Sequence, residues 1–142
     1  MKSTTNKVVD DTKVNVKIIL AGLWTVLMVL FIYADIFSLF RNGQIEKMIS
    51  GYMGPFMVTQ NSLLIASLLM AIPALMIIIS LTLKSKINRY INIVVALAYV
   101  FVEIGNMIGE TWIYYLVYGI IEIIITIFIV IKAIKWPSKI EV

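Results

Sequence analysis

The chain has 142 residues, of which 61% are hydrophobic and 14% are charged, and its mean hydropathy is +0.99. Soluble domains contain about 45–50% apolar and about 25% charged residues, so this composition excludes an ordinary soluble globule and a disordered chain. The sequence contains no cysteine and no histidine. Disulfides, thiolate chemistry and the commonest general base and transition-metal ligand are therefore excluded, and no cofactor is expected.

Four apolar stretches have close to the ~20 residues that a helix needs to cross a bilayer. They cover residues 18–40, 60–83, 90–108 and 112–131. If they were buried helices of a soluble protein, almost no polar surface would remain to face water. The sequence therefore predicts one domain over residues 1–142. Its predicted fold is an all-α integral membrane protein with four transmembrane helices in an antiparallel bundle.

The basic residues that flank the spans predict the orientation of the chain. Ten of them fall on one side of the predicted membrane: Lys2, Lys7, Lys13, Lys17, Lys84, Lys86, Arg89, Lys132, Lys135 and Lys139. Only Arg41 and Lys47 fall on the other side. Because basic residues concentrate in cytoplasmic segments, both termini are expected in the cytoplasm. Charges that flank apolar runs are typical of membrane topology, so the net charge of +4 does not predict a nucleic-acid partner.

The first span is expected to stay in the mature protein. Its polar lead is long, its apolar stretch is of full spanning length, and no small-residue cleavage site follows it. These features differ from those of a cleavable signal peptide.

The loop over residues 41–59 is the longest connection between the spans. Five apolar residues in it recur at helical spacing: Ile45, Met48, Ile49, Tyr52 and Met53. This spacing predicts a short amphipathic helix lying on the outer membrane interface, ended by Gly51, Gly54 and Pro55. A plain covering loop is the alternative.

Two further features concern helix shape and packing. Pro73 lies inside the second span, where it is expected to kink the helix and free the carbonyl group one turn earlier. Gly105 and Gly109 have the four-residue spacing that permits close approach of two helices. The second pattern suggests a homo-oligomer formed through this face, and span four is the alternative packing partner.

Carboxyl groups inside the spans are the strongest functional signal, because ionisable residues in a membrane are costly. Asp35, Glu103 and Glu122 lie well inside, and Glu110 lies at the outer rim. No lysine or arginine lies within the spans to pair with them. An isolated carboxylate in a low dielectric either takes up a proton or holds a cation.

The faces of the predicted helices group these carboxyl groups with tyrosine and asparagine. At about 100° per residue, Tyr99, Glu103, Asn106 and Glu110 fall on one face of span three. Span four repeats the pattern on one of its faces. The expected ligand- or proton-binding site is an outward-facing polar pocket of eight residues: Asp35, Tyr99, Glu103, Asn106, Glu110, Tyr115, Tyr118 and Glu122.

Within this pocket, Glu103 and Glu122 are the predicted exchangeable charges, and Asp35 and Glu110 are the predicted entrance. Asn106, Tyr99 and Tyr118 would supply ligands or hydrogen bonds.

The leading functional hypothesis is a small membrane protein that binds or transports a cation, a proton or an organic amine. Hard oxygen ligands also suit Ca²⁺ or Mg²⁺, so the metal is left open. The alternative is a structural or regulatory protein that assembles with partners, its carboxyl groups being protonated hydrogen-bonding struts between helices. An integral-membrane enzyme that uses paired carboxylates is less favoured, because no nucleophile motif or phosphate-binding glycine loop identifies a substrate.

Several short segments carry a resemblance to known proteins. They are Tyr33-Ala34-Asp35-Ile36-Phe37, Gly54-Pro55-Phe56, Ala71-Ile72-Pro73, Gly105-Asn106 and Gly109-Glu110-Thr111-Trp112. Through them the chain resembles a bacterial family of small four-span membrane proteins of unknown function. The resemblance covers most of the chain and implies a multi-pass protein of the bacterial inner membrane, with no activity attached.

In size and number of spans the chain is also similar to the small multidrug resistance transporters. Their essential glutamate lies in the first span, where this chain has Asp35 near the outer end. Their mechanism is therefore not transferred to this chain.

Overall fold

The computed structural model of the protein describes residues 12–137. These residues form five helices and one short β-hairpin: α1 (Val16–Ser38), α2 (Gln44–Ile49), β1 (Tyr52–Met53), β2 (Phe56–Met57), α3 (Gln60–Thr82), α4 (Ser85–Met107) and α5 (Ile113–Ile134). Helices α1, α3, α4 and α5 are long and apolar enough to cross a membrane, which confirms the four predicted apolar helices. α4 begins at Ser85 rather than at residue 90, because the helix extends beyond the apolar stretch and includes Lys86 and Arg89; long basic side chains at the end of a spanning helix can reach water.

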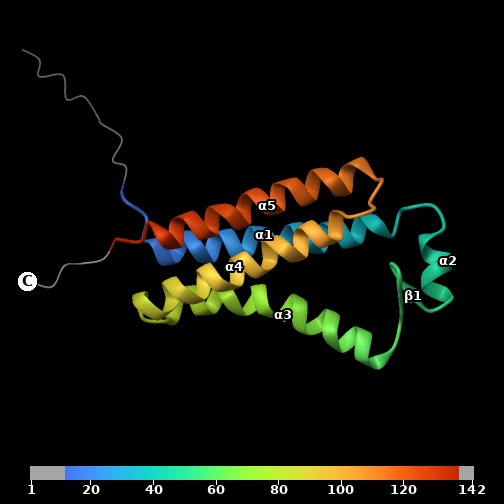
Figure 1. Ribbon diagram of the computed structural model, residues 1–142, viewed down its shortest axis with the longest axis horizontal. Coiled ribbons are helices and arrows are strands. Elements are labelled where there is room, and N and C mark those ends of the chain that lie inside the picture. The colour runs from blue at the N-terminus through green and yellow to red at the C-terminus, as the bar shows by residue number, and fades with distance from the viewer. Residues whose placement is uncertain (1–11, 138–142) are drawn as a thin grey trace, which may run out of the picture.

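The four long helices pack unevenly. α1 packs against both α3 and α5, and α4 packs mainly against α5. The start of α1 and the end of α5 lie at one end of the molecule, whereas α2 and the hairpin lie at the other (Figure 1). Toward the hairpin end, α3 diverges from the other three long helices (Figure 1).

The described basic residues of the larger predicted group lie at or next to the helix ends opposite the hairpin. Lys13 and Lys17 mark the start of α1, and Lys84, Lys86 and Arg89 surround the α3–α4 connection. Lys132 and Lys135 mark the end of α5. Lys2, Lys7 and Lys139 lie outside the described residues. The side of the membrane on which this end lies stays a prediction.

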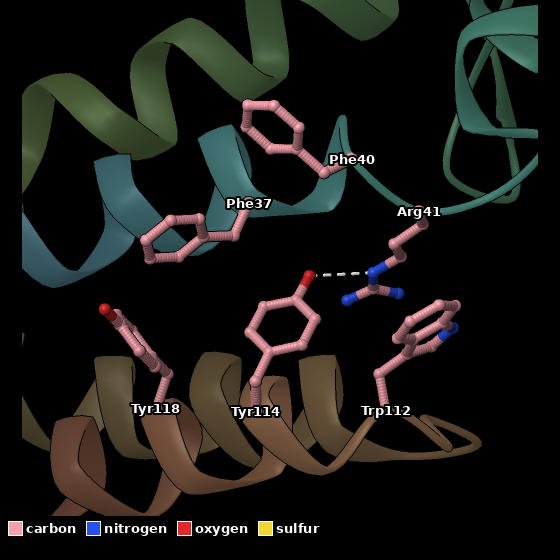
Figure 2. A pocket seen from close by; sticks show the side chains of 6 residues that line it. All are labelled: Phe37, Phe40, Arg41, Trp112, Tyr114 and Tyr118. Carbon is pink, nitrogen blue, oxygen red and sulfur yellow. Dashed lines mark hydrogen bonds between the residues drawn. The ribbon is translucent and has the colours of Figure 1, made fainter.

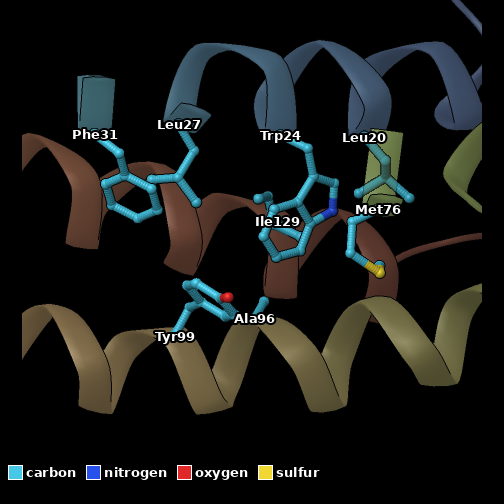
Figure 3. Packing of buried hydrophobic residues seen from close by; sticks show 8 residues of the cluster. All are labelled: Leu20, Trp24, Leu27, Phe31, Met76, Ala96, Tyr99 and Ile129. Atoms are coloured by element: carbon cyan, nitrogen blue, oxygen red, sulfur yellow. The ribbon is translucent and has the colours of Figure 1, made fainter. Parts of the chain in front are cut away.

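The buried apolar core lies between all four long helices (Figure 3). It consists of Leu20, Trp24, Leu27, Phe31, Met76, Ala96, Tyr99 and Ile129. The Trp24 ring meets the Tyr99 ring edge to face, with centroids 6.0 Å apart. Large apolar side chains such as Ile65, Ile78 and Val94 are instead exposed on the outer surfaces. A helix bundle that is apolar outside as well as inside suits a bilayer.

Pro73 frees a backbone carbonyl group that another helix then uses. Proline has no N–H group, so the Leu69 carbonyl, four residues earlier, has no donor within α3. The Tyr99 hydroxyl of α4 donates a hydrogen bond to this carbonyl, which confirms the predicted free carbonyl. The bond ties α3 to α4 near the middle of both helices.

The outer loop is only partly helical. α2 is present, but it ends at Ile49, and the prediction that Tyr52 and Met53 continue this helix was wrong. Gly51 has a φ of 85° and Gly54 has a φ of 58°, conformations that end a right-handed helix and turn the chain. Tyr52 and Met53 pair instead with β2 in an antiparallel hairpin. The position of α2 on a membrane interface stays a prediction.

Gly105 and Gly109, which were predicted to form a helix-packing face, do not lie on the same helix. α4 ends at Met107, and Gly109 lies in the connection to α5 with a φ of 79°. The expected close-packing helical face through Gly105 and Gly109 was therefore wrong, because the helical repeat stops between the two residues. A Cβ atom added at either glycine would meet open space.

Candidate functional site

A small acidic cavity lies between the long helices. It has a volume of about 30 Å³ and is lined by Phe31, Ala34, Asp35, Met70, Asn106, Tyr115 and Glu122. These residues come from α1, α3, α4 and α5. The cavity holds about one or two water-sized species. Of the eight predicted site residues, the structure brings Asp35, Asn106, Tyr115 and Glu122 together here.

Glu103 lies beside this cavity and is almost completely buried, with 1% of its surface exposed. Its Oε1 atom lies 2.6 Å from the hydroxyl oxygen of Thr126, and its Oε2 atom has no hydrogen-bond partner. Glu122 is 7% exposed, and its Oε1 atom is also without a partner. Two buried carboxyl groups from neighbouring helices thus each have one oxygen that contacts no donor.

The Thr126 hydroxyl group links these two glutamates. It lies 2.6 Å from Glu103 Oε1 and 2.8 Å from the Glu122 carbonyl oxygen. A hydroxyl group has one proton to donate and can also accept a hydrogen bond. Thr126 can therefore donate to Glu103 as a carboxylate. Equally, it can donate to the Glu122 carbonyl while accepting a hydrogen bond from a protonated Glu103, so the same geometry serves both protonation states.

Charge compensation is missing at this site. Within residues 12–137 the one ion pair joins Arg41 to Glu110, and none involves Asp35, Glu103 or Glu122. The described residues also contain no group of three or more acidic side chains placed to hold a metal ion.

The cavity reaches the protein surface on one side. Asp35 and Asn106 line it and are themselves exposed, whereas Glu103 and Glu122 are buried behind them. In the opposite direction, Leu27, Trp24 and Ile129 are completely buried and apolar. Asp35 and Asn106 therefore mark the exposed side of the cavity.

The structure places Glu110 away from the acidic cavity, in a cluster around Arg41 at the hairpin end. Glu110 Oε2 lies 2.8 Å from Arg41 Nη1. Tyr114 accepts a hydrogen bond of 2.7 Å from Arg41 Nε (Figure 2). The other Glu110 oxygen accepts hydrogen bonds from the backbone N–H groups of Thr111 and Trp112 at the start of α5. Because α4 ends at Met107, Glu110 does not continue the helical face of Glu103.

Tyr99 and Tyr118 are also placed outside the acidic cavity. The Tyr99 hydroxyl donates to Leu69, as described above. Tyr118 lines a separate, larger pocket, where its ring meets Phe37 edge to face at 6.2 Å. The expected convergence of all eight residues on one pocket was therefore wrong. Helical periodicity predicts which residues share a face of one helix. It does not predict toward which neighbouring helix that face points in the bundle.

A second buried polar cluster, which we call the amide network, was missed by the sequence reasoning. It consists of Trp24, Ser80, Asn88 and Asn92, all completely buried. Trp24 Nε1 donates to Asn92 Oδ1 at 2.7 Å, and Asn92 Nδ2 donates to Asn88 Oδ1 at 2.7 Å. Asn88 Nδ2 donates to the Ser80 carbonyl at 2.7 Å. The four-residue spacing of Asn88 and Asn92 was the available signal, since it places both on one helical face.

The Glu110 carboxyl group makes a testable contribution to stability. Its burial acts to raise its pKa, but the Trp112 N–H, the Arg41 guanidinium and the Thr111 N–H outweigh burial, so the pKa lies below its usual 4.5. A carboxyl group with a lowered pKa in the folded state stabilises the protein above the unfolded-state pKa. This contribution is lost as the pH falls through the folded-state pKa.

We therefore expect Glu110→Gln to lower the free energy of unfolding by roughly 1 kcal/mol at neutral pH. The difference from wild type should shrink as the pH falls below about 4.5. Unfolding in detergent, followed by circular dichroism from neutral to about pH 3, measures it. Glu46→Gln, an exposed position on α2, is the matched control. A Glu110→Gln deficit that is independent of pH would contradict the assignment.

Comparison with known proteins gives a family but no activity. Searches among curated proteins and among solved structures found no match. A family of unknown function, DUF6326, has a sequence model that matches residues 7–141. This small protein with four apolar helices of spanning length therefore belongs to DUF6326, a family of unknown function.

Proposed function

We propose that this membrane protein binds a small monovalent cation, a proton or a metal ion such as Na⁺, at the pair of carboxyl groups of Glu103 and Glu122. The observation that carries the proposal is the pair of buried glutamates, each with one oxygen that lacks a partner. No basic side chain among the described residues pairs with them. A buried uncompensated carboxylate is strongly unfavourable, so each group gains stability by taking up a proton or a cation.

The size of the cavity favours the smallest ligands. About 30 Å³ accommodates a proton carried by water or a nearly bare monovalent ion, but no organic amine with an apolar body. Asp35 and Asn106, which are exposed, would form the route inward. Movement across the membrane would require the buried layer of Trp24, Leu27 and Ile129 to rearrange, as in alternating access.

We expect the wild type at neutral pH to show the infrared carbonyl band of a protonated carboxyl group. Glu103→Gln and Glu122→Gln should each remove part of this band. If a metal ion competes with the proton, adding Na⁺ should weaken the band and raise the unfolding temperature, and the Gln variants should lose this response. At a concentration of about 100 times the dissociation constant, the ion would add about 2.7 kcal/mol.

Glu46→Gln is the control for this experiment, because Glu46 is exposed on α2 and lies outside the cavity. Absence of the band together with no response of the unfolding temperature to pH or to Na⁺ would contradict the proposed function.

A structural role is the second candidate, and the Thr126 contact favours it. This contact joins the Glu103 side chain of α4 to α5, so a protonated Glu103 would act as a strut between helices. In that role the carboxyl band would be present but insensitive to cations, and the Gln variants would be as stable as wild type, since glutamine keeps a hydrogen bond. Assembly with partner proteins would then be the function to test.

The proposed location is the inner membrane of a bacterium, with both termini in the cytoplasm and the acidic cavity facing outward. The excess of basic residues at the end opposite the hairpin supports this orientation. Because the chain has no cysteine, Ser85→Cys and Ser50→Cys provide single labelling sites near the two ends. An impermeant thiol reagent added to intact cells should label Ser50→Cys only, and labelling of Ser85→Cys instead would reverse the orientation.

A further inference from the structure

Arg41 lies in a cage of aromatic rings and one carboxylate. Its guanidinium carbon lies 5.4 Å from the ring centre of Trp112, 5.1 Å from that of Tyr114 and 5.0 Å from that of Tyr115. Glu110 supplies the negative charge at 2.8 Å. We call Glu110, Trp112, Tyr114 and Tyr115 the Arg41 cage. Several aromatic faces around a positive charge form the arrangement by which proteins bind organic cations.

The guanidinium group is held by Glu110, by the Tyr114 hydroxyl and by the three rings. The Arg41 side chain is only 15% exposed, and its buried Nη2 atom has no hydrogen-bond acceptor. The aromatic faces therefore surround the one guanidinium nitrogen that has no acceptor.

A pocket of about 370 Å³ adjoins the Arg41 cage; it shares Trp112 and Tyr114 with the cage and is also lined by Arg41. Its remaining lining residues are Phe37, Phe40 and Tyr118 (Figure 2). This volume lies within the ~300–1,000 Å³ typical of small-molecule sites. The one charged lining residue is Arg41, and Glu110 already compensates its charge. An anion would therefore gain little here, whereas an apolar or aromatic group would contact the aromatic rings that line this open pocket.

We propose that Arg41 is a tethered occupant of a cation-binding site, and that an amphiphilic organic cation binds there by displacing it. The cationic head would lie in the Arg41 cage, and the apolar body would fill the adjoining pocket. Arg41 lies between α1 and α2 and near Gly43, whose φ is 76°, so its side chain is carried by a connection rather than by a spanning helix. This site is separate from the acidic cavity and does not depend on the cation proposed there.

The first test removes the Arg41 side chain from the Arg41 cage. Arg41→Ala should bind ethylguanidinium, an analogue of the missing side chain, at least about tenfold more tightly than wild type, in which Arg41 competes. Calorimetry in detergent measures this affinity. Adding Glu110→Gln to Arg41→Ala should weaken binding, because the carboxylate of the cage is lost. If Arg41→Ala fails to fold, Arg41→Gln, which keeps a long polar side chain, replaces it in the same comparison.

The second test examines the ligand class on the wild-type protein. Benzyltrimethylammonium should bind and change the fluorescence of Trp112, and Trp112→Phe should abolish that change. Benzenesulfonate, which has the same ring but a negative charge, should not bind. Glu103→Gln should leave both results unchanged, so failure here and failure of the acidic cavity are distinguishable.

Three results would overturn the proposal. They are equal ethylguanidinium affinity in wild type and in Arg41→Ala, no binding to a folded Arg41 variant, and stronger binding of benzenesulfonate than of benzyltrimethylammonium. The first two would mean that Arg41 and the Arg41 cage have a purely structural role. The third would make the pocket an anion site.

Discussion

Among single substitutions in the amide network, Asn92→Ala is expected to be the most destabilising. It should lower the free energy of unfolding by about 2–4 kcal/mol. Asn92 accepts from Trp24 Nε1 and donates to Asn88 Oδ1, and the Ser80 hydroxyl lies 3.3 Å from Asn92 Oδ1. All of these side chains are completely buried. A single interhelical hydrogen bond in a membrane is worth only about 0.6 kcal/mol on average. The destabilisation expected for Asn92→Ala is larger because this one substitution leaves both Trp24 Nε1 and Asn88 Oδ1 without their partner.

Equilibrium unfolding in mixed detergent, followed by circular dichroism, measures this effect. Asn61→Ala is the matched control, because Asn61 is exposed in the first turn of α3. Trp24→Phe removes one donor of the network and keeps most of the ring volume, so it should cost less than Asn92→Ala. A loss below about 0.5 kcal/mol for Asn92→Ala would show that water or neighbouring groups satisfy the network equally well.

Tyr99→Phe is expected to destabilise the protein by about 1–2 kcal/mol, because it leaves the Leu69 carbonyl without a donor. This carbonyl lacks a partner within α3 because residue 73 is proline. In a Pro73→Ala background, the new N–H group at residue 73 can donate to Leu69. Tyr99→Phe should then cost about 1 kcal/mol less than in wild type.

A double-mutant cycle on Pro73 and Tyr99, measured by the same unfolding experiment, isolates this coupling. Tyr90→Phe is the control, because Tyr90 lies on the same helix and its side chain is exposed. Additive effects of Pro73→Ala and Tyr99→Phe would mean that the hydroxyl group does not replace the missing helical hydrogen bond.

These experiments address contacts that the sequence indicated to different degrees. The carbonyl freed by Pro73 followed from the chemistry of proline alone. Its donor did not, because Tyr99 lies 30 residues from Leu69 and meets it only through the packing of α3 on α4. The same holds for Trp24 and Asn92, which lie 68 residues apart.

The candidate site divides in the same way. The presence of Asp35, Glu103 and Glu122 in apolar helices without a basic partner in the spans is readable from composition and hydropathy. The union of Asp35, Asn106, Tyr115 and Glu122 around one cavity required four helices to be placed relative to one another. The pairing of Arg41 with Glu110 required in addition that α4 end at Met107.

By itself, the sequence determined the four apolar helices, their approximate ends and the class of the protein, a small membrane protein. Hydropathy and helix length are local properties, because each helix satisfies its own backbone hydrogen bonds within the bilayer. Only the tertiary structure decided which polar groups meet. The rotation and tilt of each helix depend on side-chain packing between segments far apart in the chain, and glycines with positive φ, such as Gly51 and Gly109, end helices that periodicity alone would continue.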